Sequence, residues 1–114
     1  MGEATSESAL AARRARRKRV LMRALISDLP GTRHFNCTIV DLNDEGARIQ
    51  VPAKFELPLA FYLINVPARL AYEGVRVWRK GDKAGVRFSR MIPLTSADPA
   101  HAFLCRLWLQ AATG

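Results

Sequence analysis

The stretch CTIVDLNDEGARIQV, Cys37 to Val51, contains a short apolar run, a polar turn and a second run of alternating character. In the second run apolar residues occupy every other position, at Ala47, Ile49 and Val51. Alternation of this kind places one face of a strand inward and the other outward. The stretch therefore predicts two antiparallel strands joined by a six-residue polar hairpin loop. Gly46 is expected to end the loop with a positive φ, which glycine adopts easily.

Other parts of the chain also have the length and composition of short strands. These parts are Val20–Ile26, Phe61–Val66, Ala68–Trp78 and Gly85–Phe88. Turn residues separate them, at Pro30-Gly31, between Pro52 and Pro58, and at Gly81-Asp82. Gly74, in the middle of the longest run, predicts a β-bulge.

The hydrophobic pattern changes to a helical period near the C-terminus. Asp98 fits an N-cap and Pro99 the first helical position. The apolar residues that follow share one helical face: Phe103, Leu104, Leu107, Trp108 and Ala111. A series of short strands followed by one amphipathic helix predicts a small all-β barrel or curled sheet that the helix closes at one end.

The charge of the chain is concentrated in one segment. The chain has 114 residues, which is the length of one domain, and a net charge of +8. Residues 13–23 hold seven of the 18 basic residues and no acidic residue, so the remainder carries 11 basic and 10 acidic groups. A concentrated cationic segment attracts polyanions such as nucleic acid, anionic lipid or a phosphorylated small molecule. Residues 1–12 are expected to form a flexible tail.

The sequence contains no signal for export and no run long enough to span a membrane. We therefore expect a cytoplasmic protein without membrane association. In that compartment Cys37 and Cys105 are expected to be reduced, and alternation points Cys37 inward. His34, Cys37 and Asp41 lie close in sequence, but a buried thiol is a poor nucleophile. His101 has no second ligand at metal-binding spacing, so we expect no metal site, no cofactor and no enzymatic activity.

The cationic segment and the polar turn together have the chemistry of a guanine-nucleotide site. The N7 and O6 atoms of guanine are acceptors that suit a bidentate arginine. The opposite edge of the base carries N–H donors, which suit a carboxylate or amide oxygen. Guanidinium is also the best side-chain partner of phosphate. The arginines of residues 13–19 would supply the hydrogen-bond donors. Asp41 and Asn43, facing them, would supply the acceptors.

Three motifs in this order resemble the PilZ domain family. They are the RxxxR pattern at Arg13 and Arg17, the DLNDEG turn at Asp41–Gly46, and VWRKGDKAGVRF at Val77–Phe88. The resemblance covers about residues 13–90. It implies a six-stranded antiparallel β-barrel over residues 13–95, including a basic arm at residues 13–19, with a C-terminal helix over residues 96–112 packed on the barrel. It also implies binding of cyclic di-GMP, a ring of two guanosines joined by two phosphodiesters.

The resemblance also implies roles for individual residues. The ligand-binding set is Arg13, Arg14, Arg17, Asp41, Asn43 and Gly46, and the residues that could assist are Arg16, Lys18, Arg19, Trp78 and Arg79. The arginines would contact phosphate and the acceptor edge of guanine, Asp41 and Asn43 would accept from guanine or ribose, and Gly46 would shape the turn. Asn43 replaces the serine of the family motif. A second RxxxR pattern, at Arg19 and Arg23, flanks strand-like residues, so Arg13 and Arg17 are preferred.

Three functional hypotheses follow. The first is a non-enzymatic cyclic di-GMP receptor, which signals in trans to an effector protein by ordering its basic arm and altering a partner-binding surface. The second is an interaction adaptor of the same fold that does not bind the nucleotide. The third is a small basic nucleic-acid-binding protein, which the sequence favours less because the strands lack interleaved exposed aromatic residues.

Overall fold

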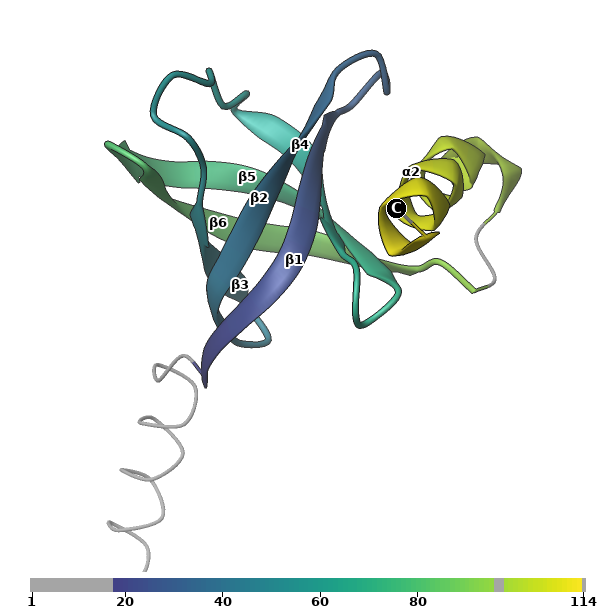
Figure 1. Cartoon of the computed structure of the whole chain (residues 1–114), viewed down its shortest axis with the longest axis horizontal. Helices are drawn as coiled ribbons and strands as arrows, with labels where there is room; N and C mark the ends of the chain where they lie inside the picture. The colour runs from purple at the N-terminus through teal and green to yellow at the C-terminus, as the bar shows by residue number, and fades with distance from the viewer. Residues whose placement is uncertain (1–17, 96–97, 114) are drawn as a thin grey trace, which may run out of the picture.

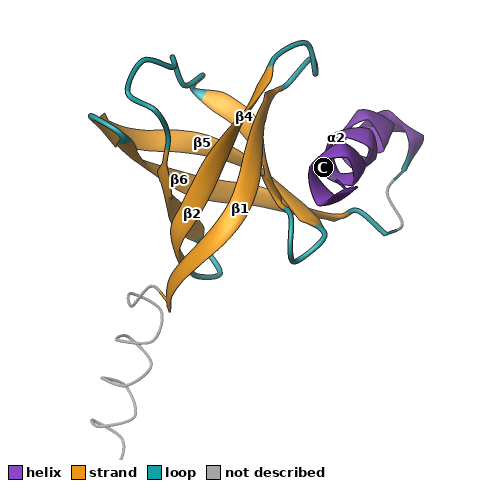
Figure 2. Cartoon of the chain, viewed as in Figure 1, coloured by secondary structure: helices purple, strands orange, loops and turns teal. Residues whose placement is uncertain are grey.

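The computed structural model of the chain describes residues 18–95 and 98–113. The six strands are β1 (Lys18–Asp28), β2 (His34–Leu42), β3 (Gly46–Gln50), β4 (Ala60–Asn65), β5 (Leu70–Lys80) and β6 (Lys83–Pro93). A single 3-10 turn, η1 (Pro99–His101), leads into the helix α2 (Ala102–Thr113). Figures 1 and 2 show the strands wrapped into a barrel with α2 beside it. The predicted all-β barrel with a C-terminal helix is confirmed.

The barrel is closed, and every pair of neighbouring strands in it is antiparallel. The strand order is β1-β2-β3-β6-β5-β4, and β4 returns to pair with β1. β1 takes part in both contacts: it pairs with β2 from Lys18 to Ser27, and its second half, Ala24–Asp28, also pairs with β4. Its first half therefore lies at the side of the barrel where β2 and β3 form their hairpin (Figure 1).

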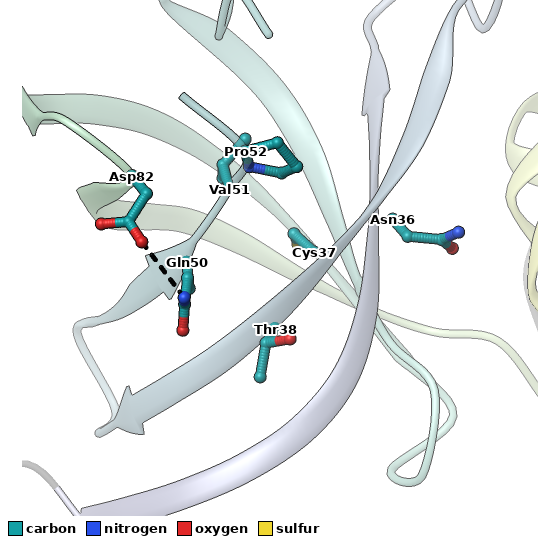
Figure 3. Close-up of a pocket in the computed structure, with 7 residues that line it drawn as sticks. All are labelled: Asn36, Cys37, Thr38, Gln50, Val51, Pro52 and Asp82. Carbon is teal, nitrogen blue, oxygen red and sulfur yellow. Dashed lines mark hydrogen bonds between the residues drawn. The ribbon is translucent and has the colours of Figure 1, made fainter. Parts of the chain in front are cut away.

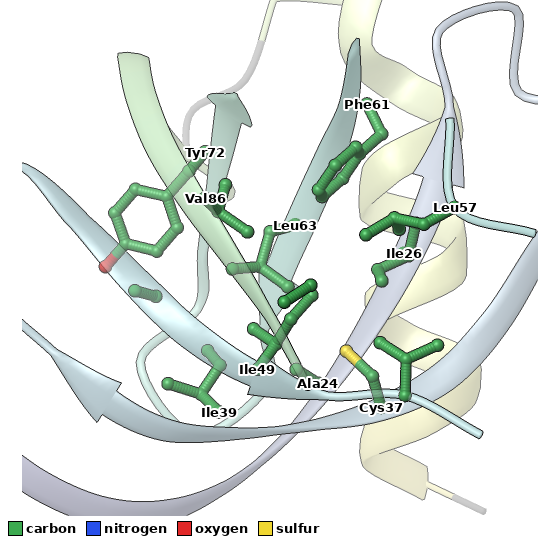
Figure 4. Close-up of a cluster of buried hydrophobic side chains, with 13 residues drawn as sticks. Ala24, Ile26, Cys37, Ile39, Ile49, Leu57, Phe61, Leu63, Tyr72 and Val86 are labelled. Atoms are coloured by element: carbon green, nitrogen blue, oxygen red, sulfur yellow. The ribbon is translucent and has the colours of Figure 1, made fainter. Parts of the chain in front are cut away.

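The core lies inside the barrel, as the alternation in the sequence predicts. Ile39, Ile49, Phe61 and Leu63 are fully buried and come from three different strands. Figure 4 shows their side chains converging between the strands, with Cys37 at the edge of the cluster. Inward side chains of small antiparallel barrels fill the interior completely, so this interior is a packed core without room for a ligand.

A second cluster of buried residues holds α2 against the outside of the barrel. Leu104 is fully buried, and Phe103 packs on the β1–β2 turn at Gly31, whose φ is +79°. A Cβ at Gly31 would lie 2.7 Å from the Phe103 ring, so this turn requires glycine. The indole N–H of Trp108 donates to the Val66 carbonyl at 2.8 Å. No helix in the described part of the chain is long and apolar enough to cross a membrane.

The N-cap prediction for this helical segment is confirmed. The Asp98 carboxylate accepts from the Ala100 N–H at 2.7 Å, and Pro99 follows directly. The segment begins as a 3-10 turn, however, and the α-helix proper begins at Ala102.

Several strand boundaries differ from the predictions. β1 begins at Lys18, so Lys18 and Arg19 belong to the barrel although we assigned them to the basic arm. β2 continues through Leu42, so the hairpin loop contains only residues 43–45. The last strand runs to Pro93. In each case backbone pairing continues beyond the predicted end of the strand, and the added residues include the polar Asp41 and Arg90 as well as the buried Ile92.

The bulge predicted at Gly74 is present as an irregularity between β5 and β6. The pairing shifts between Glu73 and Gly74, and the extra residue is Ser89 on the partner strand β6. The Ser89 hydroxyl donates to the Glu73 carbonyl at 2.9 Å. The glycine is needed for space, because a Cβ at Gly74 would lie 2.8 Å from Cγ1 of Val86.

The two thiols are expected to differ in reactivity. Both cysteines are free, and burial raises the pKa of Cys37 to about 12. At pH 8 only about one Cys37 in ten thousand is then a thiolate. We expect iodoacetamide to modify the half-buried Cys105 in the native protein and to leave Cys37 intact, as measured by intact mass. Unfolding in guanidinium is the control, and both thiols should react there. Equal labelling of Cys37 in the native state would contradict its burial.

Candidate functional site

A row of residues crosses the outer face of the barrel from β5 to β1. Each member lies directly opposite the next on the neighbouring strand: Trp78, Gly85, Arg48, Asp41 and Arg19. Directly opposed residues of antiparallel strands share one face of the sheet. Ala47 and Ile49, on either side of Arg48, are buried in the core, so the Arg48 side chain faces outward. The row ends at Arg19, and the basic arm therefore joins the barrel beside Asp41.

β-bulges lie next to this row on three strands. The extra residues are Val20 and Leu21 in β1, which together oppose Val40, then Val40 itself in the β2–β3 pair, and Val77 in β5. A bulge breaks the in-and-out alternation and turns side chains toward the surface. This explains why Leu21 is 83% exposed although it lies within an apolar strand. Bulges are common beside functional sites, where they re-aim side chains.

The bulge residues form the floor of a hollow on the outer face. This outer hollow has a volume of about 580 Å³ and is lined by Val20, Leu21, Val40, Arg48 and Lys83. Its size falls in the range of small-molecule sites, roughly 300–1,000 Å³. Three apolar side chains and two cations line it, a combination that suits a ligand with a flat apolar part and an anionic part. The outer hollow lies where β1 begins, which is where the basic arm joins the barrel.

Asp41 and Arg48 form an ion pair at the centre of the row. An Nη of Arg48 contacts Oδ2 of Asp41. Asp41 is only 4% exposed, whereas 41% of the Arg48 side chain remains accessible. Among the described residues, Nε of Arg48 is buried and has no hydrogen-bond partner. Arg48 is thus the more accessible member of the pair, and Asp41 is almost completely buried.

Asn43 builds the turn between β2 and β3. Its Oδ1 accepts from the N–H groups of Glu45 and Gly46, each at 2.9 Å. Its own N–H donates to the Gly46 carbonyl at 3.0 Å. An amide oxygen has two lone pairs, and the turn uses both. Asn43 therefore stabilises the hairpin, a role that its Asx-type chemistry also predicts.

The reason predicted for Gly46 is wrong. Gly46 is not among the positive-φ glycines, which are Gly31 and Gly81 in the described chain. Glycine is needed at this position because the strands approach closely. A Cβ here would overlap the carbonyl oxygen of Val86 on β6. Glycine at position 46 is therefore required by the close approach of β3 and β6 and not by its φ.

The structure places the remaining predicted residues as follows. The indole of Trp78 covers Gly85 and is 42% exposed, so it lies on the same face as Arg48. The guanidinium of Arg79 donates to the carbonyls of Phe55, Pro52 and Gly81 at 3.0, 3.2 and 2.9 Å, which ties it to two loops away from Asp41. Arg13, Arg14, Arg16 and Arg17 lie outside the described residues, and only the backbone of Lys18 and Arg19 is described.

A second hollow lies where β2 and β3 diverge (Figure 3). It measures about 340 Å³, and its lining residues are Asn36, Cys37, Thr38, Gln50, Val51, Pro52 and Asp82. The Gln50 amide donates to Asp82 at 3.2 Å across it. The lining contains one acidic residue and no basic one, so this hollow does not suit an anionic ligand.

The sequence analysis missed two cationic residues of the outer hollow, Arg48 and Lys83. The alternation had already placed Arg48 on the outer face, directly after the turn. Its pairing with Asp41 depends on the bulge at Val40, which nothing in the local sequence marks. No protein-family model matches the chain, and neither does any curated protein.

Proposed function

We propose that this protein is a non-enzymatic receptor for cyclic di-GMP. The observation that carries the proposal is the pairing of Arg19 with Asp41 between β1 and β2. Arg17 lies two residues before Arg19, so the Cα atoms of these two residues are at most about 7 Å apart. Arg19 and Asp41 are 22 residues apart in sequence. Their adjacency is what a shared guanine-nucleotide site requires.

The outer hollow supports the same proposal. Its apolar floor of Val20, Leu21 and Val40 offers a surface for the face of a purine. The basic arm supplies guanidinium groups for phosphate and for the N7 and O6 atoms of guanine. In the proposed mechanism, ligand binding neutralises the arginines and orders the arm against the barrel. Ordering of a segment on ligand binding is a known kind of switch. An effector protein would then bind the altered surface.

We expect Arg17→Ala to weaken cyclic di-GMP binding about 10- to 100-fold. The reason is the loss of a charge-assisted hydrogen bond to phosphate or guanine, worth roughly 1.5–3 kcal/mol. Isothermal titration calorimetry of the full chain measures the change. The midpoint of thermal unfolding should stay the same, because Arg17 precedes the first strand.

Arg106→Ala is the matched control, since Arg106 is an exposed arginine of α2. It should bind as the parent does. If the parent and the Arg17→Ala variant bind cyclic di-GMP equally well, Arg17 does not contact the ligand. A parent that gives no heat at micromolar cyclic di-GMP would refute the receptor function itself.

One observation favours the adaptor as the second candidate function. The two acceptors expected to read guanine already have protein partners: the Asp41 carboxylate pairs with Arg48, and Oδ1 of Asn43 accepts two N–H groups of its own turn. An adaptor needs neither acceptor for a ligand. Absence of heat in the same titration would support the adaptor. A gel shift with steep salt dependence that cyclic di-GMP does not compete away would instead support nucleic-acid binding.

A further inference from the structure

We propose that Arg48 and Lys83 bind a phosphate of the ligand in the outer hollow, and that Asp41 is a positioning residue that holds Arg48. This differs from the role implied for Asp41 by the family resemblance, where its carboxylate would contact guanine directly. The inference rests on the proposed function only for the identity of the ligand as a cyclic dinucleotide. The site itself is defined by a pair of cations beside an apolar floor.

The burial of Asp41 argues for the positioning role. Asp41 is 4% exposed and lies between Arg48 and Arg19 in the pairing of three strands. A carboxylate that reads the N–H edge of a base must present its oxygens to that base. Here Oδ2 contacts the guanidinium of Arg48, and the Asp41 side chain is only 6% exposed, so little of the carboxylate is accessible to a base. Asp41 therefore fixes the direction of Arg48 in the way that a buried carboxylate orients other functional groups.

Arg48 is well suited to bind phosphate from this position. Guanidinium carries five N–H donors in a planar fork, so one edge can bond a carboxylate while another bonds a phosphate. The ion pair fixes the side chain, which lowers the entropy lost when a ligand binds. Arg48 also lines the outer hollow, and a large part of its side chain is accessible there.

Lys83 supplies a second cation on the next strand. It pairs with Gln50, which lies two residues from Arg48 on β3, and this register places the Cα atoms of the two cations roughly 8 Å apart on one face. The Lys83 ammonium lies 3.6 Å from Asp82, and both side chains are nearly half exposed. Exposed pairs of this kind are weak, so phosphate can replace Asp82 as the partner of Lys83.

The two cations lie at one side of the outer hollow. The outer hollow is bordered by the start of β1 on one side and by Arg48 and Lys83, from β3 and β6, on the other. A cyclic dinucleotide has two phosphodiesters on opposite sides of its ring. Arg48 with Lys83 would bind one of them, and Val20 and Leu21 at the start of β1 would lie against a base of the ligand. The predicted ligand class is a compact phosphate diester with two phosphates and an aromatic face.

Calorimetric titrations of the full chain test the cation pair. The probes are cyclic di-GMP, 5′-GMP and pyrophosphate, each at two salt concentrations. We expect Lys83→Gln to weaken cyclic di-GMP binding about fivefold and Arg48→Gln about tenfold or more, with Arg48→Lys between the parent and Arg48→Gln. Both neutral variants should reduce the salt dependence of binding, because each removes a phosphate contact. Lys54→Gln and Arg106→Gln remove exposed cations that do not line the outer hollow, and they should bind as the parent does.

A double-mutant cycle tests the role of Asp41. If Asp41 acts through Arg48, Asp41→Asn weakens binding of cyclic di-GMP, and adding it to Arg48→Gln causes little further loss. Selectivity for cyclic di-GMP over cyclic di-AMP should then be unchanged in Asp41→Asn. Additive losses, or a loss of that selectivity, would show direct contact with guanine and overturn the positioning role. Thermal unfolding of each variant identifies any that does not fold, and Lys83→Gln tests the site without disturbing a buried charge.

The possible results separate this inference from the proposed function. If the parent binds cyclic di-GMP and the Arg48→Lys and Lys83→Gln variants bind equally well, the phosphate site is refuted while the receptor stands. If only 5′-GMP or pyrophosphate binds, and the same variants weaken it, the phosphate site stands and the receptor function is wrong. If none of the three phosphate probes binds, both proposals are wrong.

Discussion

Alanine in place of Gly46 is expected to lower the free energy of unfolding by about 3 kcal/mol, the upper part of the range for overpacked sites. The added Cβ would overlap the carbonyl oxygen of Val86, and the Val86 carbonyl carbon lies 3.2 Å from the same position. Both atoms are backbone of the adjacent strand β6. A side chain can rotate away from such an overlap, but backbone cannot, so β3 and β6 would have to separate. Urea denaturation followed by circular dichroism measures the loss.

Gly81→Ala is the control for this prediction. Gly81 has a φ of +59°, and a Cβ there would meet nothing within 4 Å. This variant therefore carries only the cost of a left-handed conformation, about 1–2 kcal/mol. A Gly46 variant that is no less stable than the Gly81 variant would show that β3 and β6 do not approach as closely as described. Because Gly46 ends the turn that carries Asn43, we also expect its alanine variant to bind cyclic di-GMP less well than the parent.

Truncation of Phe61 to alanine should destabilise the barrel by about 3–5 kcal/mol. Phe61 is fully buried and is the largest of the fully buried side chains. Figure 4 shows it in the core between Leu57 and Leu63. Its removal loses the transfer free energy of the ring and leaves a cavity that a closed barrel cannot collapse to fill. The midpoint and slope of a urea titration give the value.

Phe55→Ala provides the matched comparison. Phe55 lies in the loop between β3 and β4, is 36% exposed, and packs on Phe35 at a ring-centroid distance of 4.8 Å. Its truncation should cost about 1 kcal/mol. Similar losses for the two phenylalanines would mean that the interior of the barrel is not packed as described. Ligand binding should be unaffected by Phe55→Ala, because the loop lies away from the outer hollow.

The functional proposal combines two kinds of support. The motifs in the sequence resemble those of a family that binds cyclic di-GMP, and the backbone pairing places Arg19, near the start of β1, opposite Asp41. The ion pair between Asp41 and Arg48 changes the proposed division of roles, since Asp41 is 4% exposed whereas 41% of the Arg48 side chain is accessible. The experiments on Arg17, Arg48 and Lys83 therefore test three different contacts of one proposed ligand.

The sequence by itself determined the class of the fold. It also determined which face of a strand each residue occupies wherever the alternation is unbroken. The alternation at Ala47, Ile49 and Val51 predicted a half-buried strand, and Asp98 with Pro99 predicted the start of the helical segment. These predictions succeeded because they depend on local periodicity and local hydrogen bonds. Both involve only residues that are close together in the sequence.

Only the tertiary structure decided which side chains meet on the outer face. The bulges at Val20-Leu21, Val40 and Val77 each add one residue to a strand, and none of them contains a glycine or another local marker. The first two shift the register so that Asp41 lies opposite both Arg48 and Arg19. Register between strands depends on the packing of the whole barrel, because one inserted residue changes the face of every side chain that follows. The outer hollow and the Asp41–Arg48 pair therefore follow from the closure of the barrel and not from any single stretch of sequence.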